Sequence, residues 1–143
     1  ICSDSFYNCK KLHQIEFSND SQIQKIDSNS FFCTSIEKIT IPPLVEYLNF
    51  DAFSKCNKLK KIEFASDSQL QKIELFSILD TSITSIVLPS KFTSLYGLPY
   101  SCENLQIIEI NSNTKIEIQL KFNSGKSRSL IAMVHAKVEV IFI

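Results

Sequence analysis

The stretch Cys56-Asn57-Lys58-Leu59-Lys60-Lys61-Ile62-Glu63-Phe64 decides the fold of this chain of 143 residues. It has the form C-x-x-L-x-x-I-x-F, and close copies of it occur four more times. The first apolar residues of the copies lie 22 to 24 residues apart, in the series Leu12, Ile36, Leu59, Ile83 and Leu105. A fixed period of roughly 20 to 30 residues is typical of a solenoid, in which each coil stacks on the next.

Two kinds of coil alternate along the chain. After Phe17 the sequence reads S-N-D-S-Q-I-Q-K-I, and after Phe64, which lies 47 residues later, it reads A-S-D-S-Q-L-Q-K-I. The other coils turn through Ile41-Pro42-Pro43 and Leu88-Pro89-Ser90 instead. Coils of the same kind therefore recur every second repeat.

Each coil is predicted to begin with a strand, because apolar and polar residues alternate in Leu12–Phe17 and Ile36–Ile41. Residues 49–56 are predicted to form a short helical turn with Phe53 buried. The chain has only two glycines, which predicts few left-handed turns. One coil cannot fold alone: burying about five side chains at ~2 kcal/mol each does not offset the ordering of ~23 residues. We therefore expect a parallel β-sheet on the concave face, with short strands and helical turns on the convex face.

The repeat pattern changes after Ile110. Residues 116–122 alternate as in a strand, residues 123–126 have turn composition, and residues 130–134 return toward the repeats. We interpret residues 111–134 as an inserted β-hairpin. A partial sixth coil is predicted at Val138, Ile141 and Ile143, so that residues 1–143 form a single solenoid domain of about five coils of 22–24 residues.

Composition limits the classes of partner. The chain has 15 basic and 15 acidic residues, which gives no electrostatic reason to expect nucleic acid or an anionic membrane surface as partner. No apolar run approaches the ~20 residues that span a bilayer, so no membrane insertion is expected. The first residues show neither an initiator Met nor a signal pattern, and we expect the chain to be part of a longer protein, with further repeats or a partner protein at both ends.

The cysteines follow the repeat. Four of the five precede a strand by the same three residues, namely Cys9, Cys33, Cys56 and Cys102, whereas Asp80 takes that place in the fourth copy. Recurrence at one register predicts small buried thiols that pack coil on coil. Free thiols favour an intracellular, reducing compartment, within a cytoskeletal or other large assembly, with the cell surface as the alternative.

Catalysis has little support in the sequence. The histidines His13 and His135 lie beside no recognisable nucleophile or acid motif, and no glycine-rich phosphate loop is present. The sequence contains no C-x-x-C pair of the kind that would suggest a zinc site. We expect no enzyme activity, no cofactor and no metal site.

A candidate protein-binding surface lies on the concave face, because residues between the ladder positions of each strand point outward. These residues form two columns that are polar at first and become apolar later: Gln14, Glu16, Lys38, Thr40, Lys61, Glu63, Ser85, Val87, Ile107 and Glu109. An ordinary solvated sheet surface is the alternative interpretation, since single exposed apolar residues are common.

The chain resembles the leucine-rich repeats, whose L-x-x-L-x-L pattern is matched by L-x-x-I-x-F/I. More narrowly it is similar to the BspA-like leucine-rich repeats, whose unit reads approximately L-x-x-I-x-I-P-x-x-V-x-x-I-x-x-x-A-F-x-x-C. One stretch of this chain supplies nine of those positions: Ile36, Ile39, Ile41, Pro42, Val45, Leu48, Ala52, Phe53 and Cys56. The segment from Leu120 to Ile131 also resembles an insert of that family, whereas Asp80 and the loss of the usual Gly after Leu48 depart from the pattern.

The resemblance implies a leucine-rich-repeat solenoid that binds proteins or mediates adhesion without chemistry of its own. Three functions stay open: a protein-protein interaction scaffold that is a structural component of a larger assembly, a fragment of a cell-surface adhesin, and a regulatory repeat domain of a larger enzyme. Fold alone does not choose among them.

Overall fold

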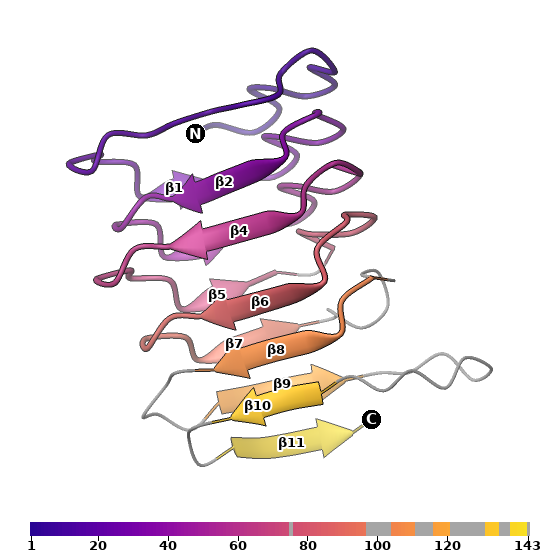
Figure 1. Ribbon diagram of the computed structural model, residues 1–143. Coiled ribbons are helices and arrows are strands. Elements are labelled where there is room, and N and C mark those ends of the chain that lie inside the picture. Colours follow the sequence, from indigo (N-terminus) through magenta and orange to yellow (C-terminus); the bar gives the residue numbers. More distant parts are fainter. Residues whose placement is uncertain (75, 97–103, 111–115, 121–130, 135–137, 143) are drawn as a thin grey trace.

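The coils of the chain stack into a parallel β-solenoid with two layers of strands (Figure 1). The computed structural model describes residues 1–74, 76–96, 104–110, 116–120, 131–134 and 138–142. Each coil passes once through each layer, and the strands of the two layers run in opposite directions, as β8 and β9 show in Figure 1. The parallel sheet predicted from the repeat is therefore confirmed.

The front layer of Figure 1 contains the strands predicted from the L-x-x-I-x-F copies. Its strands are β2 (Lys38–Ile41), β4 (Lys61–Phe64), β6 (Ser85–Leu88), β8 (Ile107–Ile110) and β10 (Ile131–Val134). Parallel ladders join β2 to β4, β6 to β8 and β8 to β10, and β4 lies next to β6. Alternate residues of β2, β6 and β8, such as Ile39 and Ile41, are buried between the layers.

The back layer is one continuous parallel sheet. Its strands are β1 (Lys25–Ile26), β3 (Tyr47–Leu48), β5 (Lys72–Ile73), β7 (Ser94–Tyr96), β9 (Ile116–Leu120) and β11 (Val138–Phe142). The first three of these strands have two residues each, of which the second, such as Ile26 or Leu48, is buried. They bring the chain back to the core after the turn that follows each front strand.

The first apolar residues of the repeats form a single row, as the sequence predicts. Ser35 N donates to the Leu12 carbonyl at 3.1 Å, and Ser82 N donates to the Leu59 carbonyl at 2.9 Å. Backbone hydrogen bonds therefore join neighbouring coils at this row. Ile36, Leu59 and Ile83 are fully buried in this row, and Leu105 is buried with 8% of its surface exposed. Leu12 is half-buried against the same core.

An aromatic column fills the turn that leads back to the front layer. The Phe31 ring stacks on Phe6 at 5.1 Å between centroids and on Phe53 at 5.2 Å, with interplanar angles of 9° and 5°. Phe31 and Phe53 are completely buried. The prediction that Phe53 is buried is confirmed, and equivalent side chains of successive coils lie directly over one another.

The helical turns predicted for the convex side are absent from the described residues, in which no helix occurs. In the turn of residues 49–56, Asp51 and Lys55 have left-handed backbone with φ of 55° and 58°. A left-handed residue cannot continue a right-handed helix, so consecutive tight turns form instead, closed by Ala52 N to the Asn49 carbonyl and Ser54 N to the Asp51 carbonyl. The expectation of few left-handed residues was also wrong, because residues other than glycine adopt this conformation.

These turns add a third line of hydrogen bonds between coils. The backbone N–H groups of Asn29, Phe31 and Cys33 donate to carbonyls of the next coil, with N–O distances of 3.2, 2.9 and 2.9 Å. The intervening N–H groups close the turns themselves. Every second donor is therefore free to bind the neighbouring coil, which a continuous helix would not allow.

The predicted hairpin within residues 111–134 is not what the strands form. β9 pairs in parallel with β7 and β11, whereas β10 pairs in parallel with β8 in the other layer. Residues 121–130, which include the predicted turn, lie outside the described residues. Parallel pairing is favoured because each strand then extends an existing ladder. A hairpin of β9 with β10 would instead leave the edges of β7 and β8 unpaired.

Two further predictions need correction. Leu12–Phe17 contains no strand, although the carbonyls of Leu12 and His13 accept hydrogen bonds from the residues just before β2. The residues from Val138 onward, interpreted as a sixth copy of the front strand, form β11 of the back layer instead. In both places the alternation of side chains predicted a strand of the front layer, and the ladders of the structure differ from that prediction.

The cysteines do not share one environment. Cys56 is buried, Cys33 is half-buried, and Cys2 and Cys9 are exposed. In the second coil Thr34, not Cys33, takes the buried place, and its Oγ1 lies 3.2 Å from the Cys56 Sγ. That coil has one residue fewer between the turn and the strand, so counting back from the strand assigns the buried place to Cys33 by mistake. Cys102 lies outside the described residues.

Candidate functional site

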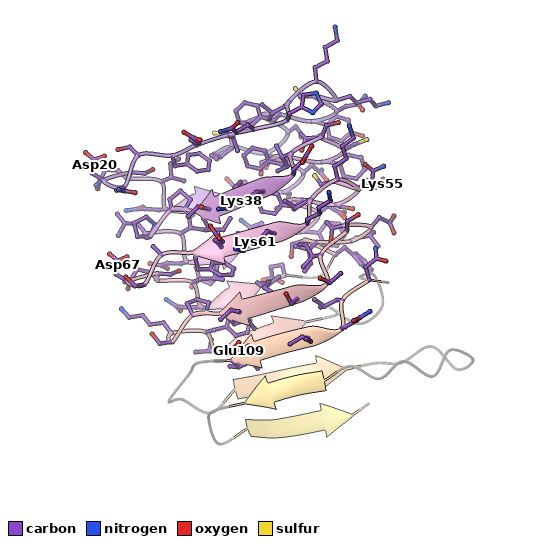
Figure 2. All side chains as sticks on the ribbon, in the orientation of Figure 1. Asp20, Lys38, Lys55, Lys61, Asp67 and Glu109 are labelled. Carbon is purple, nitrogen blue, oxygen red and sulfur yellow. The ribbon has the colours of Figure 1, made fainter. Side chains whose placement is uncertain are left out.

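The outward side chains of the front layer form two columns that run across the strands. The first column is Gln14, Lys38, Lys61, Ser85 and Ile107, and the second column is Glu16, Thr40, Glu63, Val87 and Glu109. The ladders place Lys38 beside Lys61 and Thr40 beside Glu63. They also place Ser85 beside Ile107 and Val87 beside Glu109. Figure 2 shows Lys38, Lys61 and Glu109 on this face.

One carboxylate joins two coils within the columns. Glu63 on β4 accepts Lys38 Nζ of β2 at 2.8 Å and Lys61 Nζ at 2.6 Å, and Thr40 Oγ1 donates to it at 3.4 Å. The hydrogen bonds from Lys38 and Lys61 lower the pKa of Glu63 to about 2. Glu63 is therefore ionised at neutral pH, and it forms ion pairs with both ammonium groups.

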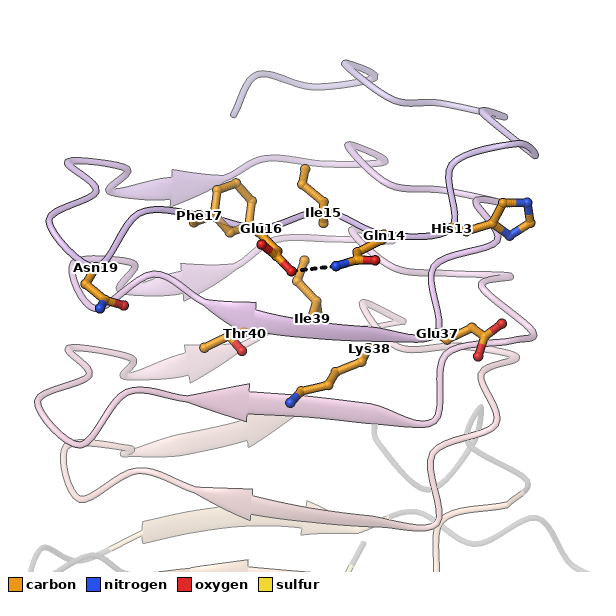
Figure 3. Close-up of a pocket in the computed structure, with 10 residues that line it drawn as sticks. All are labelled: His13, Gln14, Ile15, Glu16, Phe17, Asn19, Glu37, Lys38, Ile39 and Thr40. Atoms are coloured by element: carbon orange, nitrogen blue, oxygen red, sulfur yellow. Dashed lines mark hydrogen bonds between the residues drawn. The ribbon is translucent and has the colours of Figure 1, made fainter.

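The end of the face at the first coil is polar. Gln14 Nε2 donates to Glu16 Oε1, and both side chains are exposed (Figure 3). They lie above Lys38 and Thr40 at the rim of a hollow of about 600 Å³, while His13 and Glu37 lie at one end of it. Because Leu12–Phe17 is not in a ladder, these two residues belong to the columns by sequence spacing and not by strand register.

The opposite end of the face is apolar. The Val87 side chain is 49% exposed, and Ile107 and Glu109 next to it are half-buried. A second hollow of about 570 Å³ lies between Glu63 on β4 and Val87 on β6. An exposed valine beside a recess is a surface that a partner side chain can cover.

The sequence interpretation missed one strand of this face. β10 continues the front layer, with Ile131 in register with Ile107 and Met133 in register with Glu109. The signal was available, because Ile131 follows Ile107 by 24 residues, the spacing of the other copies. The hairpin interpretation of residues 111–134 obscured it.

The described residues offer no constellation for chemistry. No group of three or more His, Cys, Asp or Glu side chains among them is arranged to hold a metal ion. Burial raises the pKa of the Cys56 thiol, although the hydrogen bond with Thr34 acts in the opposite direction. A thiol of this kind is a poor nucleophile. Within the described part of the chain there is also no helix of the length and apolarity that crossing a membrane requires.

Comparison with known proteins identifies the class of repeat. The sequence matches the family described as BspA type leucine rich repeat region (6 copies), over residues 1–98 and 24–133. These matches cover most of the chain, so the protein belongs to this family. Repeats of this family generally bind proteins and are typically non-catalytic.

A similar solved structure is a leucine-rich repeat protein from Bacteroides ovatus ATCC 8483. The TM-score is 0.41 and the sequences are 17% identical. The match covers 98% of this chain and 59% of that protein, so the chain spans little more than half of its length. No curated protein matches the sequence.

Proposed function

We propose that the chain is a non-catalytic scaffold that binds another protein through the two columns of the front layer, as a structural component of a larger assembly. The observation that carries this proposal is Val87, which points outward from the centre of a strand with 49% of its surface exposed. Its neighbours on the partner strand, Ile107 and Glu109, are only half-buried.

The surroundings of Val87 have the anatomy of a small interface. An apolar centre with a polar rim is the usual arrangement where proteins meet. Here the rim is the Lys38–Glu63–Lys61 cluster on one side and Glu109 on the other. The ladders fix the backbone of these residues before binding, so no backbone entropy of these strands is lost on association.

Site-specific photo-crosslinking in the native cell tests the proposal. A photoreactive residue at Ser85, which is exposed beside Val87, should give discrete crosslinked products, and Val87→Asp in the same chain should remove them, because a carboxylate in the apolar centre is desolvated on binding.

The matched control places the same photoreactive residue at Glu46, which is exposed on the opposite side of the solenoid before β3. That position should give none of the products. If Ser85 yields no product, or yields the same products as Glu46, the front layer is not the binding surface.

A further inference from the structure

The front layer has two seams, where neighbouring stretches of the described chain lie side by side without a ladder between them. One seam separates Leu12–Phe17, which forms no strand, from β2. The other separates β4 from β6, which belong to different sheets. Both seams follow coils whose first apolar residues lie 24 positions apart, whereas the coils of 22 or 23 residues are joined by ladders. The seams therefore recur with the period of the two-coil unit.

A hollow lies at each seam, and the walls of the two hollows are equivalent. The hollow of about 600 Å³ at the first coil is drawn in Figure 3, and the hollow of about 570 Å³ lies at the seam between β4 and β6. Most lining positions of the first hollow recur 47 residues later in the second, such as Glu16 at Glu63 and Phe17 at Phe64. Thr40 lines both hollows, so they adjoin each other on the front layer.

Each hollow contains one phenylalanine ring that the core does not fully cover. Phe17 and Phe64 are half-buried, whereas Ile41 and Leu88, at the same position of the coils that ladders join to the next coil, are completely buried. The partly exposed rings thus occur where the front layer is open. Grooves lined by aromatic side chains are the usual binding sites for proline-rich segments in the polyproline II conformation.

The separation of the hollows selects among the conformations that a bound segment can adopt. Two coils, at ~4.8 Å between strands, place equivalent points about 10 Å apart along the stack. In polyproline II, three residues advance about 9.3 Å and return the side chain to the same side. Side chains on one face of a β-strand recur every ~7 Å, which does not match this separation. A helix presents a continuous apolar stripe, which would cover the Lys38–Glu63–Lys61 cluster on the two strands between the seams.

The charges of the first hollow favour a basic residue in the bound segment. Glu16 and Glu37 line this hollow, and neither forms an ion pair with another described residue. Lys38 in the same hollow is paired with Glu63 instead. In the second hollow, Lys61 and Glu63 are paired with each other. Uncompensated negative charge therefore lies at one end of the pair of hollows.

We propose that the front layer binds a proline-rich segment in the polyproline II conformation that runs along the stack. Prolines three residues apart occupy the two hollows, and a Lys or Arg lies over Glu16 and Glu37. This inference rests on the proposed function and names the class of partner segment. The carbonyls of polyproline II have no internal hydrogen bonds, so the hydroxyls of Thr40 and Ser85, which line the hollows, can donate to them.

Fluorescence anisotropy with designed peptides tests the inference. The probe is a fluorescein-labelled peptide that begins with one lysine and has a proline at every third position, with alanines between. The control peptide has the same composition, with its prolines spaced alternately two and four residues apart. The control should bind at least about tenfold more weakly, because only one of its prolines can then lie in a hollow. Replacing the lysine of the probe by glutamate should also weaken binding, and Glu16→Gln with Glu37→Gln in the chain should remove that difference.

A variant of the chain locates the binding site of the probe. Val87→Asp places a carboxylate in the second hollow, and it should weaken binding of the probe at least about tenfold because the carboxylate is desolvated by the bound proline. The matched control is Thr93→Asp, which makes the same change of net charge at an exposed residue just before β7 in the back layer. It should leave binding of the probe unchanged. Circular dichroism of each variant verifies the fold.

The inference is overturned if the probe does not bind at up to about 1 mM chain, if the probe and the control peptide bind equally, or if folded Val87→Asp binds the probe as the natural chain does. In each case, crosslinks from Ser85 that Val87→Asp removes would leave the proposed function standing. If Ser85 gives no crosslinks and the probe does not bind, both proposals fail.

Discussion

Eight described residues other than glycine hold left-handed backbone, and they recur in pairs four residues apart in each turn. Some are Asn or Asp, which tolerate this conformation through local hydrogen bonding, but Lys55 has φ of 58° and no such ability. Its Cβ is strained against the backbone, and its ammonium group lies 5.5 Å from the centre of the Phe32 ring. Substitutions at Lys55 can therefore distinguish the free-energy cost of the left-handed backbone from the stabilisation that the contact with Phe32 provides.

We expect Lys55→Gly to be more stable than Lys55→Ala by about 1 kcal/mol, because both lose the contact with Phe32 but only Gly removes the strained Cβ. Urea unfolding followed by circular dichroism measures the difference. At Lys60, which is exposed and has no positive φ, the order should reverse, with Gly less stable than Ala by about 0.5–1 kcal/mol. The same order at both positions would contradict this account of the turns.

Glu63 makes stability depend on pH. Its pKa is lowered from 4.5 to about 2 in the folded chain by Lys38 and Lys61, so the folded state holds the ionised form more favourably than the unfolded state does. The contribution is present above about pH 4.5 and is lost as the pH falls through about 2. It is small, because the ion pairs are exposed and screened by salt.

The variant Glu63→Gln should unfold at a lower urea concentration than the natural chain at pH 7, and the gap should close as the pH falls from about 4.5 to about 2. High salt should narrow the gap at pH 7. Lys38→Met should remove part of it, because Lys38 is the stronger of the two influences on the Glu63 pKa. A gap that stays constant between these pH values would show that Glu63 acts through packing and not through charge.

At the scale of the element, the aromatic column packs successive turns against one another through stacked rings. Phe31 is fully buried and stacks on two rings, whereas Phe6 is half-buried and stacks on one. We expect Phe31→Ala to lower the free energy of unfolding by about 3–5 kcal/mol through the cavity and the two lost ring pairs. Phe6→Ala should cost clearly less. Equal losses in urea unfolding would mean that the column does not depend on its central ring.

The strands of the front layer could be predicted from the sequence, and the turns could not. β2, β4, β6 and β8 follow from the apolar spacing alone, because a fixed period places Ile36, Leu59 and their equivalents over one another. The left-handed turns were missed because glycine was taken as their marker, while here residues such as Lys55 adopt this conformation and donate their N–H to a carbonyl of the next coil, Leu79 in this case. β9 and β10 were predicted as extended chain, but a strand's partner depends on ladders that a local pattern does not contain.

The candidate site was predictable to a similar depth. Strand alternation identifies which residues point outward, and the ladders place the members of each column side by side on β2 and β4 and again on β6 and β8. That these columns bind a protein stays a prediction. The ion pair between Lys38 and Glu63 was not predicted, since it joins residues 25 positions apart and depends on the register of two coils. The strand that extends the face, β10, was missed because residues 111–134 were interpreted as a hairpin, although the spacing of Ile131 from Ile107 agrees with the repeat.

At the scale of the whole molecule, each coil is bound to its neighbour along three separate lines: the front layer, the back layer and the turns. Contacts across more than one coil play little part, because the layers pair strands only with the adjacent coil. Stability is then close to a sum over neighbouring coils. A change in one coil should accordingly be felt most strongly in the two that flank it.

The alternation of two kinds of turn has a consequence for how such a chain grows. Ser18–Gln22 and Ala65–Gln69 form the same local hydrogen bonds, with Gln22 Nε2 and Gln69 Nε2 each donating to an Asp carbonyl two residues earlier, at 2.9 and 2.6 Å. A gene duplication that copies both kinds of coil together joins each turn to the neighbour it already fits. Unequal crossing-over in units of two coils can therefore lengthen the molecule, and with it the exposed face. Every junction between coils in the longer chain then already occurs in the shorter one.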